Sequence, residues 1–378
     1  MILSPLVAER DRRRLHDWPL ILVALVLTLV GIAAINSVDM AVSAKAGVLQ
    51  SFAVKQCVFG AVGMVGLVAV SYCNTELWRR VGGFLYWVNM LMLGAVLVVG
   101  KTVNGSKRWL VFGPVQVQPG DFAKIIVILT LAAFFVANIE RIREWSTLWR
   151  SLRHIAPPMV LLLLEPHYGG AACIFVAWVL MALYAGMPWR HIGAVVVALL
   201  VLLGAGFASP QILGKVLQPF QVVRIQQKID EILGHNKDPK GAGYQQSQSE
   251  LAVAVGGTVG VGYGRGERKQ AKFIPEQQSD FIFSVVGEEL GFAGSAAVVL
   301  LFGFFLYRVW LVSYRCVEDM DKLVAAGILA VLGFHTVTNL AMVLNAGLVV
   351  GLWLPFMSAG GTALVACLAM VGLLDSLR

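Results

Sequence analysis

Long apolar stretches, separated by short polar connections, follow one another along most of the chain. A helix needs about 20 predominantly apolar residues to cross the hydrocarbon core of a bilayer. One stretch is shorter, and the Pro- and Gly-containing sequence 165–170 separates it from its successor, which predicts a broken helix. The pattern predicts an all-α integral membrane protein with ten transmembrane helices, at 18–37, 52–72, 84–100, 121–138, 154–164, 169–187, 191–208, 281–307, 322–347 and 355–376.

Composition supports this prediction. Of the 378 residues, 58% are hydrophobic and 14% are charged, whereas about 25% are charged in a typical soluble domain. The mean hydropathy of +0.76 excludes an ordinary cytosolic enzyme, a disordered protein and a secreted disulfide scaffold. The five cysteines and six histidines show no disulfide or metal-ligand spacing. Residues 1–17 are polar and basic, so we expect no cleavable signal peptide.

Basic residues set the expected orientation. With the N-terminus inside, the short cytoplasmic segments hold fifteen Lys and Arg, and the short outer loops hold four. Short loops rich in Lys and Arg stay in the cytoplasm. We therefore expect a single polytopic membrane domain, 1–378, with both termini cytoplasmic and one large extracytoplasmic loop, 209–280, before the eighth span. The net charge of +8 then reflects orientation, and no nucleic-acid partner is expected.

The large outer loop has two recognisable parts. Residues 218–233 alternate apolar and charged positions, which predicts an amphipathic helix. Residues 256–266 are rich in glycine, but no strand–helix unit and no Walker lysine accompany them. We interpret this run as a flexible or tightly turning loop and not as a phosphate-binding motif.

Scarce carboxylates mark candidate chemistry. Asp280 lies where the outer loop enters the eighth span, and Glu276 lies four residues earlier, on the same face if a helix begins there. A partly desolvated carboxylate at the membrane–water boundary is suited to general-base catalysis. Alternatively, Ser279 or Asp280 caps the helix N-terminus. Position alone leaves both interpretations open.

Charged residues within the predicted spans leave similar alternatives. Glu288 and Glu289 lie roughly 12 Å deeper than Asp280 at 1.5 Å per residue, where a charge favours either a function or an interhelical hydrogen bond. Asp121 and Lys124 open the fourth span beside Gln118, and capping or snorkelling explains them as well as a site does.

A dense basic pair lies in a short outer loop, against the positive-inside bias. Binding of an anionic ligand, such as a lipid-linked phosphate, would explain the position of Lys107 and Arg108. Binding of anionic lipid headgroups would also explain it.

Five segments resemble the motifs of one family. Residues 273–291, FIPEQQSDFIFSVVGEELG, closely resemble the signature of the shape, elongation, division and sporulation (SEDS) family, typified by RodA and FtsW. The other four, in family order, are GSKRWL at 105–110, QPGDFAK at 118–124, GYQQSQS at 243–249 and LPFMSAGGT at 354–362. Together they extend over nearly the whole chain.

The resemblance implies a peptidoglycan glycosyltransferase of the bacterial inner membrane. Such enzymes polymerise lipid II on the outer face of that membrane during cell elongation or division, beside a class B penicillin-binding protein and other elongasome or divisome proteins. The family's essential aspartate falls on Asp280. Substrate contacts are expected at Lys107, Arg108, Glu276, Ser279, Gln246, Ser247 and Ser358, and supporting roles at Gln118, Asp121, Lys124, Glu288 and Glu289. No cofactor is required with certainty, although a divalent cation, Mg or Mn, would suit a pyrophosphate leaving group.

The chain departs from the family pattern at several positions. Gln277 replaces a frequent Arg, Gln278-Ser279 replaces His-Thr, His167 replaces an Asp, and Ala359 replaces a Tyr. The choice between an elongation and a division paralogue stays open. Two other functions also fit the pattern: a flippase for lipid-linked precursors, and a non-catalytic scaffold that recruits the transpeptidase.

Overall fold

The computed structural model describes residues 16–42, 51–103, 106–113, 115–208, 244–267, 274 and 276–377. The amphipathic helix predicted at 218–233 lies outside these residues.

Each of the ten predicted stretches contains a helix. Six helices of the described chain are long and apolar enough to cross a membrane: α1, α2, α3, α4, α12 and α13. The helices in these stretches are α1 (Trp18–Val42), α2 (Phe52–Ser71), α3 (Thr75–Val99), α4 (Pro119–Ala137), α5 (Trp145–Leu164), α6 (Tyr168–Tyr184), α7 (Trp189–Ala208), α12 (Ile282–Arg315), α13 (Asp319–Val343) and α14 (Gly361–Ser376). Two more are α10 (Tyr244–Val255) and the short 3-10 helix η3 (Ile139–Arg141).

Some helices begin or end at other residues than the predicted spans, in some cases because polar residues form part of the helix. Helices α3 and α5 each begin nine residues before the predicted start, because their first turns are helical but carry polar and charged side chains. Helix α14 begins at Gly361, six residues after its predicted start. The residues before it turn back instead, and Phe356 has a positive φ of 65°.

A small antiparallel sheet, which the sequence analysis did not predict, follows α3. Strands β1 (Lys101–Val103), β2 (Ser106–Phe112) and β3 (Val115–Val117) pair in chain order. Leu110 lies opposite Val117, and Gly113 between β2 and β3 has a φ of 59°. The all-α prediction is therefore wrong for the segment between α3 and α4, where alternation over so few residues is a weak signal.

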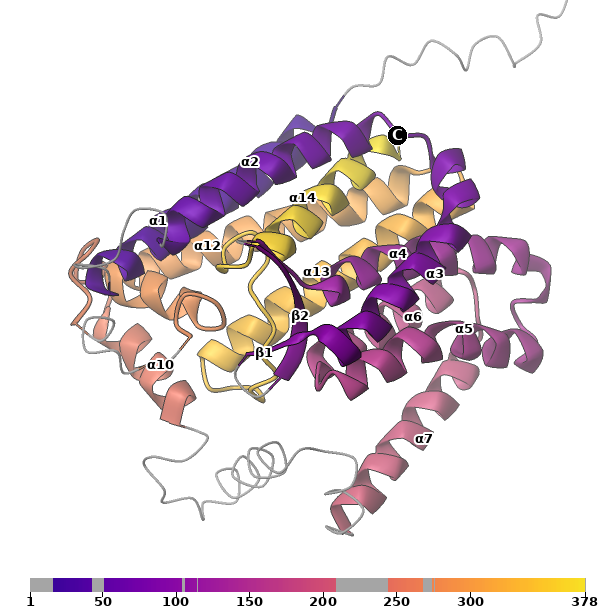
Figure 1. Cartoon of the computed structure of the whole chain (residues 1–378). Helices are drawn as coiled ribbons and strands as arrows, with labels where there is room; N and C mark the ends of the chain where they lie inside the picture. The colour runs from indigo at the N-terminus through magenta and orange to yellow at the C-terminus, as the bar shows by residue number, and fades with distance from the viewer. Residues whose placement is uncertain are drawn as a thin grey trace, which may run out of the picture.

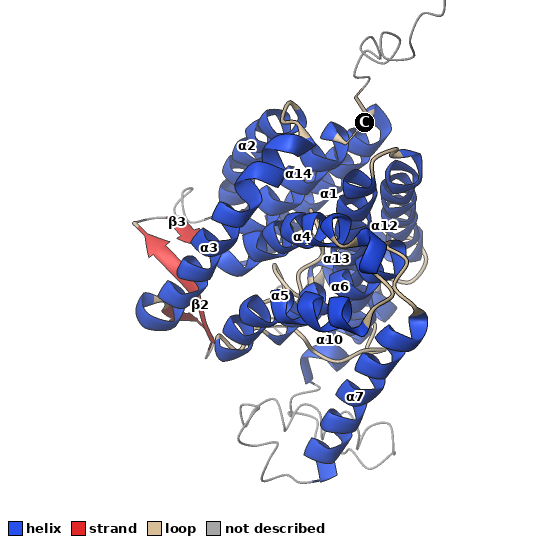
Figure 2. Ribbon diagram, turned by 90° about the vertical axis from the view of Figure 1, so that its right-hand side faces the viewer, coloured by secondary structure: helices blue, strands red, loops and turns tan. Residues whose placement is uncertain are grey.

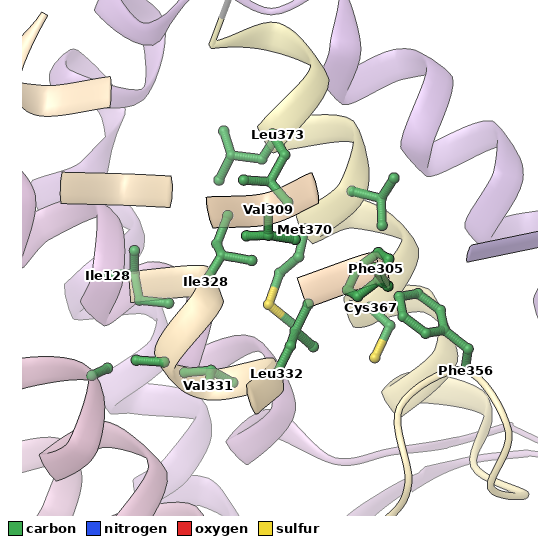
Figure 3. Close-up of a cluster of buried hydrophobic side chains, with 14 of the residues drawn as sticks. Ile128, Phe305, Val309, Ile328, Val331, Leu332, Phe356, Cys367, Met370 and Leu373 are labelled. Atoms are coloured by element: carbon green, nitrogen blue, oxygen red, sulfur yellow. The ribbon is translucent and has the colours of Figure 1, made fainter. Parts of the chain in front are cut away.

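Helix α13 lies at the centre of the bundle. It contacts α12, α14, α4 and α6, and Figure 1 shows it between these helices, with α7 extending away from the bundle. Figure 3 shows the apolar cluster that joins Ile128 of α4, Phe305 of α12, Ile328 of α13 and Met370 of α14. These side chains are at most 1% exposed. The elements therefore pack as one bundle around α13, and Figure 2 shows the sheet on its outside.

Helix α12 is broken at Gly291, where φ is 64° and ψ is −161°. The glycine-rich run packs against this break through its backbone: the N–H of Gly262 donates to the carbonyl of Glu289 over 3.0 Å, and the N–H of Phe292 donates to that of Gly257 over 2.8 Å. A Cβ on Gly260 would lie 2.1 Å from the Glu289 carbonyl oxygen. The run therefore turns tightly, as predicted, but the break in the eighth predicted span was missed.

Candidate active site

Asp280 lies in a turn that precedes α12. Residues 276–281 form this turn, and Phe281, the residue at the N-cap, makes no side-chain capping hydrogen bond. Glu276 is exposed, has a φ of 55°, and accepts backbone hydrogen bonds from Ser279 and Asp280, each over 3.1 Å. The residue at the N-cap of α12 is thus Phe281 and not Ser279 or Asp280, and Glu276 shares no helical face with Asp280, because α12 begins after both.

Three successive carbonyls hold the turn against other elements. The Asn339 amide of α13 donates to the carbonyl of Asp280 over 2.8 Å. The Ser358 hydroxyl donates to the carbonyl of Ser279 over 2.6 Å. The N–H of Ala359 donates to the carbonyl of Gln278 over 2.8 Å. These bonds fix the backbone of the half-buried Asp280 from two directions, which is the preorganisation that a catalytic side chain needs.

The segment before α14 is itself fixed from within the bundle. The Asn339 amide also donates to the carbonyl of Leu352 over 2.7 Å, and the N–H of Leu354 donates to the Ser358 hydroxyl over 2.8 Å. Gly351, with a φ of 67°, lies so close to the turn that a Cβ there would be 3.6 Å from Oδ2 of Asp280. Residues 351–359 therefore form a wall against the Asp280 turn, in which Gly351 lies beside the carboxylate.

A fully buried ion pair lies behind this wall. Lys124 and Asp121 are each 1% exposed, and their Nζ and Oδ1 atoms are 3.1 Å apart. Asp121 also accepts from Trp353 Nε1 over 3.2 Å and from the Thr362 hydroxyl over 3.2 Å. Four groups from α4, α14 and the preceding segment thus satisfy one another, which a buried pair requires.

His335 of α13 completes this polar core. Its Nε2 lies 3.2 Å from Lys124 Nζ, and its Nδ1 lies 3.1 Å from the Trp353 carbonyl oxygen. A lysine ammonium can only donate, so Nε2 accepts and Nδ1 donates. The imidazole also stacks on the Trp353 ring, with centroids 3.8 Å apart. Capping or snorkelling therefore does not account for Lys124, which is locked inside the protein.

Polar residues also gather at the break between α5 and α6, in addition to the Asp280 turn and the Lys124–Asp121 pair. Arg108 donates to the backbone carbonyls of Glu165 and Pro166. The Gln118 amide lies 3.5 Å from Nδ1 of His167. Glu165 is 0% exposed, and neither carboxyl oxygen has a hydrogen-bond partner among the described residues. Burial raises the pKa of Glu165 to about 8, although the Arg108 charge opposes the shift, so this carboxyl is neutral near pH 7.

Helix N-termini converge on these groups. Gln118 precedes α4 and touches His167, which precedes α6, while Thr362 in the first turn of α14 donates to Asp121 in the first turn of α4. The turn before α12 is bonded to the segment before α14. Unsatisfied N–H groups and helix dipoles make such ends favourable for an anion.

Other predicted site residues have structural partners. Lys107 Nζ donates to the carbonyls of Leu97 and Val98 at the end of α3, over 2.8 and 2.7 Å. Gln246 is buried, and its amide donates to the carbonyls of Met342 and Gly347. Their contacts with substrate remain predictions, as does that of Ser247, which is exposed on α10.

Glu288 and Glu289 lie beside the break in α12. Glu289 Oε1 accepts from the Ser37 hydroxyl of α1 over 2.6 Å. Glu288 is 1% exposed, and a Cβ on Gly266 would meet its carboxylate at 2.7 Å. The sequence left two explanations for these carboxylates, a function or an interhelical hydrogen bond. The hydrogen bond is present for Glu289.

Comparison with known proteins identifies the family. The family model for the cell cycle proteins FtsW, RodA and SpoVE matches residues 17–378. The chain belongs to the FtsW/RodA/SpoVE family. The resemblance inferred from the sequence motifs is thereby confirmed.

Individual family members are similar over most of their length. The chain is 34% identical to the probable peptidoglycan glycosyltransferase FtsW of Allochromatium vinosum, covering 95% of this chain and 88% of the relative. It is 30% identical to the peptidoglycan glycosyltransferase MrdB of Escherichia coli, covering 84% and 83%. Both are named as enzymes of the same reaction.

Solved structures of the family share the fold. One, from a peptidoglycan synthase complex that coordinates polymerization and crosslinking, has 29% identity and a TM-score of 0.78 over 96% of this chain and 97% of that chain. The rod shape determining protein RodA of Thermus thermophilus has 26% identity and a TM-score of 0.66 over 96% and 95%.

Several residues of the polar core around Asp121, Lys124 and the Asp280 turn were not among the predicted site residues. Asn339, His335, Trp353 and Thr362 join the predicted residues only through the fold. One signal was present: His335 and Asn339 lie four residues apart in an apolar span, on one helix face. No group of three or more His, Cys, Asp or Glu that could hold a metal occurs in the described part of the chain.

Proposed function

We propose that this chain is a peptidoglycan glycosyltransferase that polymerises lipid II into glycan strands. Membership of the family and its relatives' names support the reaction class. The observation that carries the assignment of the site is the Asp280 turn, whose three successive carbonyls are held by Asn339, Ser358 and Ala359. Such a turn fixes the backbone that carries the carboxylate.

Asp280 acts as the general base in this proposal. Its carboxylate takes the proton from the 4-hydroxyl of the acceptor sugar while that oxygen forms a bond to the anomeric carbon of the donor. The bond between this carbon and the pyrophosphate oxygen breaks, and its electron pair leaves with undecaprenyl pyrophosphate. Attack opposite the leaving group inverts the anomeric carbon and gives a β-1,4 linkage.

Arg108 and the converging helix N-termini would bind the leaving pyrophosphate. Arg108 lies over the break between α5 and α6, and the N-termini of α4, α6 and α14 lie nearby. Positive groups placed where charge develops stabilise the transition state. Lys107 and Ser358 are further candidates for substrate contact. The described residues show no clustered metal ligands, so the proposal includes no step through Mg or Mn.

The topology and partners belong to the same proposal. The basic bias of the short loops supports ten spans, cytoplasmic termini and a site that faces the outside, with 209–280 as one extracytoplasmic loop in a single polytopic domain. The similar chain in a peptidoglycan synthase complex supports a class B penicillin-binding protein as partner. Proteins named FtsW, MrdB and the rod shape determining protein RodA are all similar to this chain, so the proposal includes both elongation and division.

The test is polymerisation of labelled lipid II by the purified chain, with and without a partner transpeptidase. We expect Asp280→Asn to lower the rate by about 10²–10⁴ without lowering thermal stability. Asp319→Asn is the matched control, because Asp319 is an exposed carboxylate in the first turn of α13 that pairs with Lys322.

Full polymerisation by Asp280→Asn would remove Asp280 as the base. Transfer of lipid II across liposomes without polymer would favour a flippase instead. Full rescue of depleted cells by Asp280→Asn would favour a non-catalytic scaffold.

A further inference from the structure

A cleft of about 480 Å³ opens between three helices away from the proposed active site. Helices α3, α4 and α5 contact one another around it. Its walls are Tyr86, Trp87 and Met90 of α3, Phe134 and Asn138 at the end of α4, and Arg150, Arg153, His154 and Pro157 of α5. The volume lies within the range of small-molecule sites, about 300–1,000 Å³.

The cleft lies toward the opposite end of the bundle from Asp121. Helix α4 begins beside the proposed active site and reaches the cleft at Phe134, thirteen residues after Asp121. At 1.5 Å per residue, about 20 Å of helix separates them. A pyrophosphate held at the Asp280 turn therefore does not account for the arginines of this cleft.

Two arginines give the cleft a positive wall. No carboxylate of the described residues lies within ion-pairing distance of Arg150 or Arg153, and Arg150 has only a long contact of 3.5 Å with Asn138. By contrast, Arg79 and Arg80 of α3 both pair with Glu76. Both cleft arginines are exposed and therefore available to an anion.

Apolar side chains line another part of the cleft, beside the polar Asn138 and His154, and exposed tryptophans lie on the same helices. Met90, Phe134 and Pro157 line it. Trp87 is 69% exposed, and Trp145 and Trp149 on the first half of α5 are 50% and 64% exposed. Exposed tryptophans gather at membrane–water interfaces, where one side of the ring meets hydrocarbon and the other meets headgroups.

The ligand chemistry follows from this combination. We propose that the cleft binds an anionic phospholipid, with its phosphate between Arg150 and Arg153 and an acyl chain along Met90 and Phe134. Guanidinium groups bind phosphate oxygens in a bidentate geometry, and the apolar wall favours a lipid over a soluble phosphate. This inference does not depend on the reaction at Asp280.

The test is native mass spectrometry of the purified full chain with phosphatidylglycerol or phosphatidylcholine of identical acyl chains. We expect phosphatidylglycerol to bind at least tenfold more tightly. Arg150→Gln with Arg153→Gln should reduce this affinity by about tenfold or more, whereas Arg150→Lys with Arg153→Lys should keep part of it. Arg79→Gln with Arg80→Gln is the matched control and should leave it unchanged.

Equal binding of the two lipids by the wild-type chain would overturn the proposal without the need for any variant. Loss of the preference in the Arg79 and Arg80 control, with retention in the Arg150 and Arg153 variant, would also overturn it. Displacement of phosphatidylglycerol by an equal concentration of glycerol phosphate would show a soluble-phosphate site and contradict the lipid assignment. Polymerisation of lipid II by the same preparations checks the proposed function separately.

Discussion

Asp280 and Asp121 lie before or within the first turn of a helix at the same end of the bundle, but they are held in opposite ways. Asp121 is 1% exposed, and its side chain accepts from Lys124, Trp353 and Thr362. Asp280 is half-buried, and the bond from Asn339 holds its backbone carbonyl. Backbone fixation holds a carboxylate in place whether or not it is protonated, whereas a buried ion pair depends on its charge. The proposed general base is thus held through its backbone, whereas Asp121 is held through its charged side chain.

The largest expected effect on stability lies at the buried pair. Lys124→Met leaves the Asp121 carboxylate buried without its cation, and breaking such a pair costs about 3–5 kcal/mol. We expect a large fall in the thermal unfolding midpoint in detergent, and a smaller fall when Asp121→Asn is combined with it, because the uncompensated charge is then removed. Asp280→Asn should leave the midpoint nearly unchanged. Equal destabilisation by all three variants would contradict the comparison.

An intermediate effect is expected at Asn339, which holds the Asp280 turn beside the segment before α14. Asn339→Ala removes the bonds to the carbonyls of Asp280 and Leu352, so the Asp280 turn loses one of its anchors. We expect kcat for lipid II polymerisation to fall by about tenfold to hundredfold, with a smaller change in KM.

Two further variants show whether this loss comes from positioning. Ser358→Ala, which removes the bond to the carbonyl of Ser279, should have an effect in the same direction. Thr336→Val is the control, because the Thr336 hydroxyl bonds, among the described residues, only to its own helix, at Leu332. An unchanged kcat for Asn339→Ala would show that the turn keeps its position without this anchor.

A different kind of effect, a pH dependence of stability, concerns Glu165. Burial raises its pKa from 4.5 to about 8, so the folded chain holds a proton that the unfolded chain releases. The associated stability is complete below pH 4.5 and is lost as the pH rises through 8. Glu165→Gln mimics the neutral acid, so its melting midpoint should fall less between pH 5 and pH 9.

Thermal melts at several pH values check this expectation. Glu144→Gln, at an exposed carboxylate before α5, is the control. Parallel curves for the wild type and Glu165→Gln would show that Glu165 does not hold the proton.

Apolar length allowed the helices to be predicted, but the contacts between them were less predictable. Each predicted stretch contains a helix, because spans require long apolar sequences whatever packs around them. Asp280, Asp121 and Lys124 could be singled out because charged residues are rare in such a chain. Trp353 could not, since its bond to Asp121 joins residues more than 200 positions apart. The sheet at 101–117 and the backward turn at Phe356 depend on tertiary packing in the same way.

The main chains pack directly against each other at Gly260 and Gly291. This close packing affects how mutations in this chain are interpreted. A Cβ at either position would lie within 2.3 Å of another main-chain atom. Every substitution there therefore forces two main-chain segments apart. A saturation scan scored by cell growth would thus find these glycines as intolerant as the aspartate at the proposed reaction centre. Loss of growth at these glycines results from a steric clash between main-chain segments. Measuring the amount of correctly inserted protein distinguishes this effect from loss of catalytic activity.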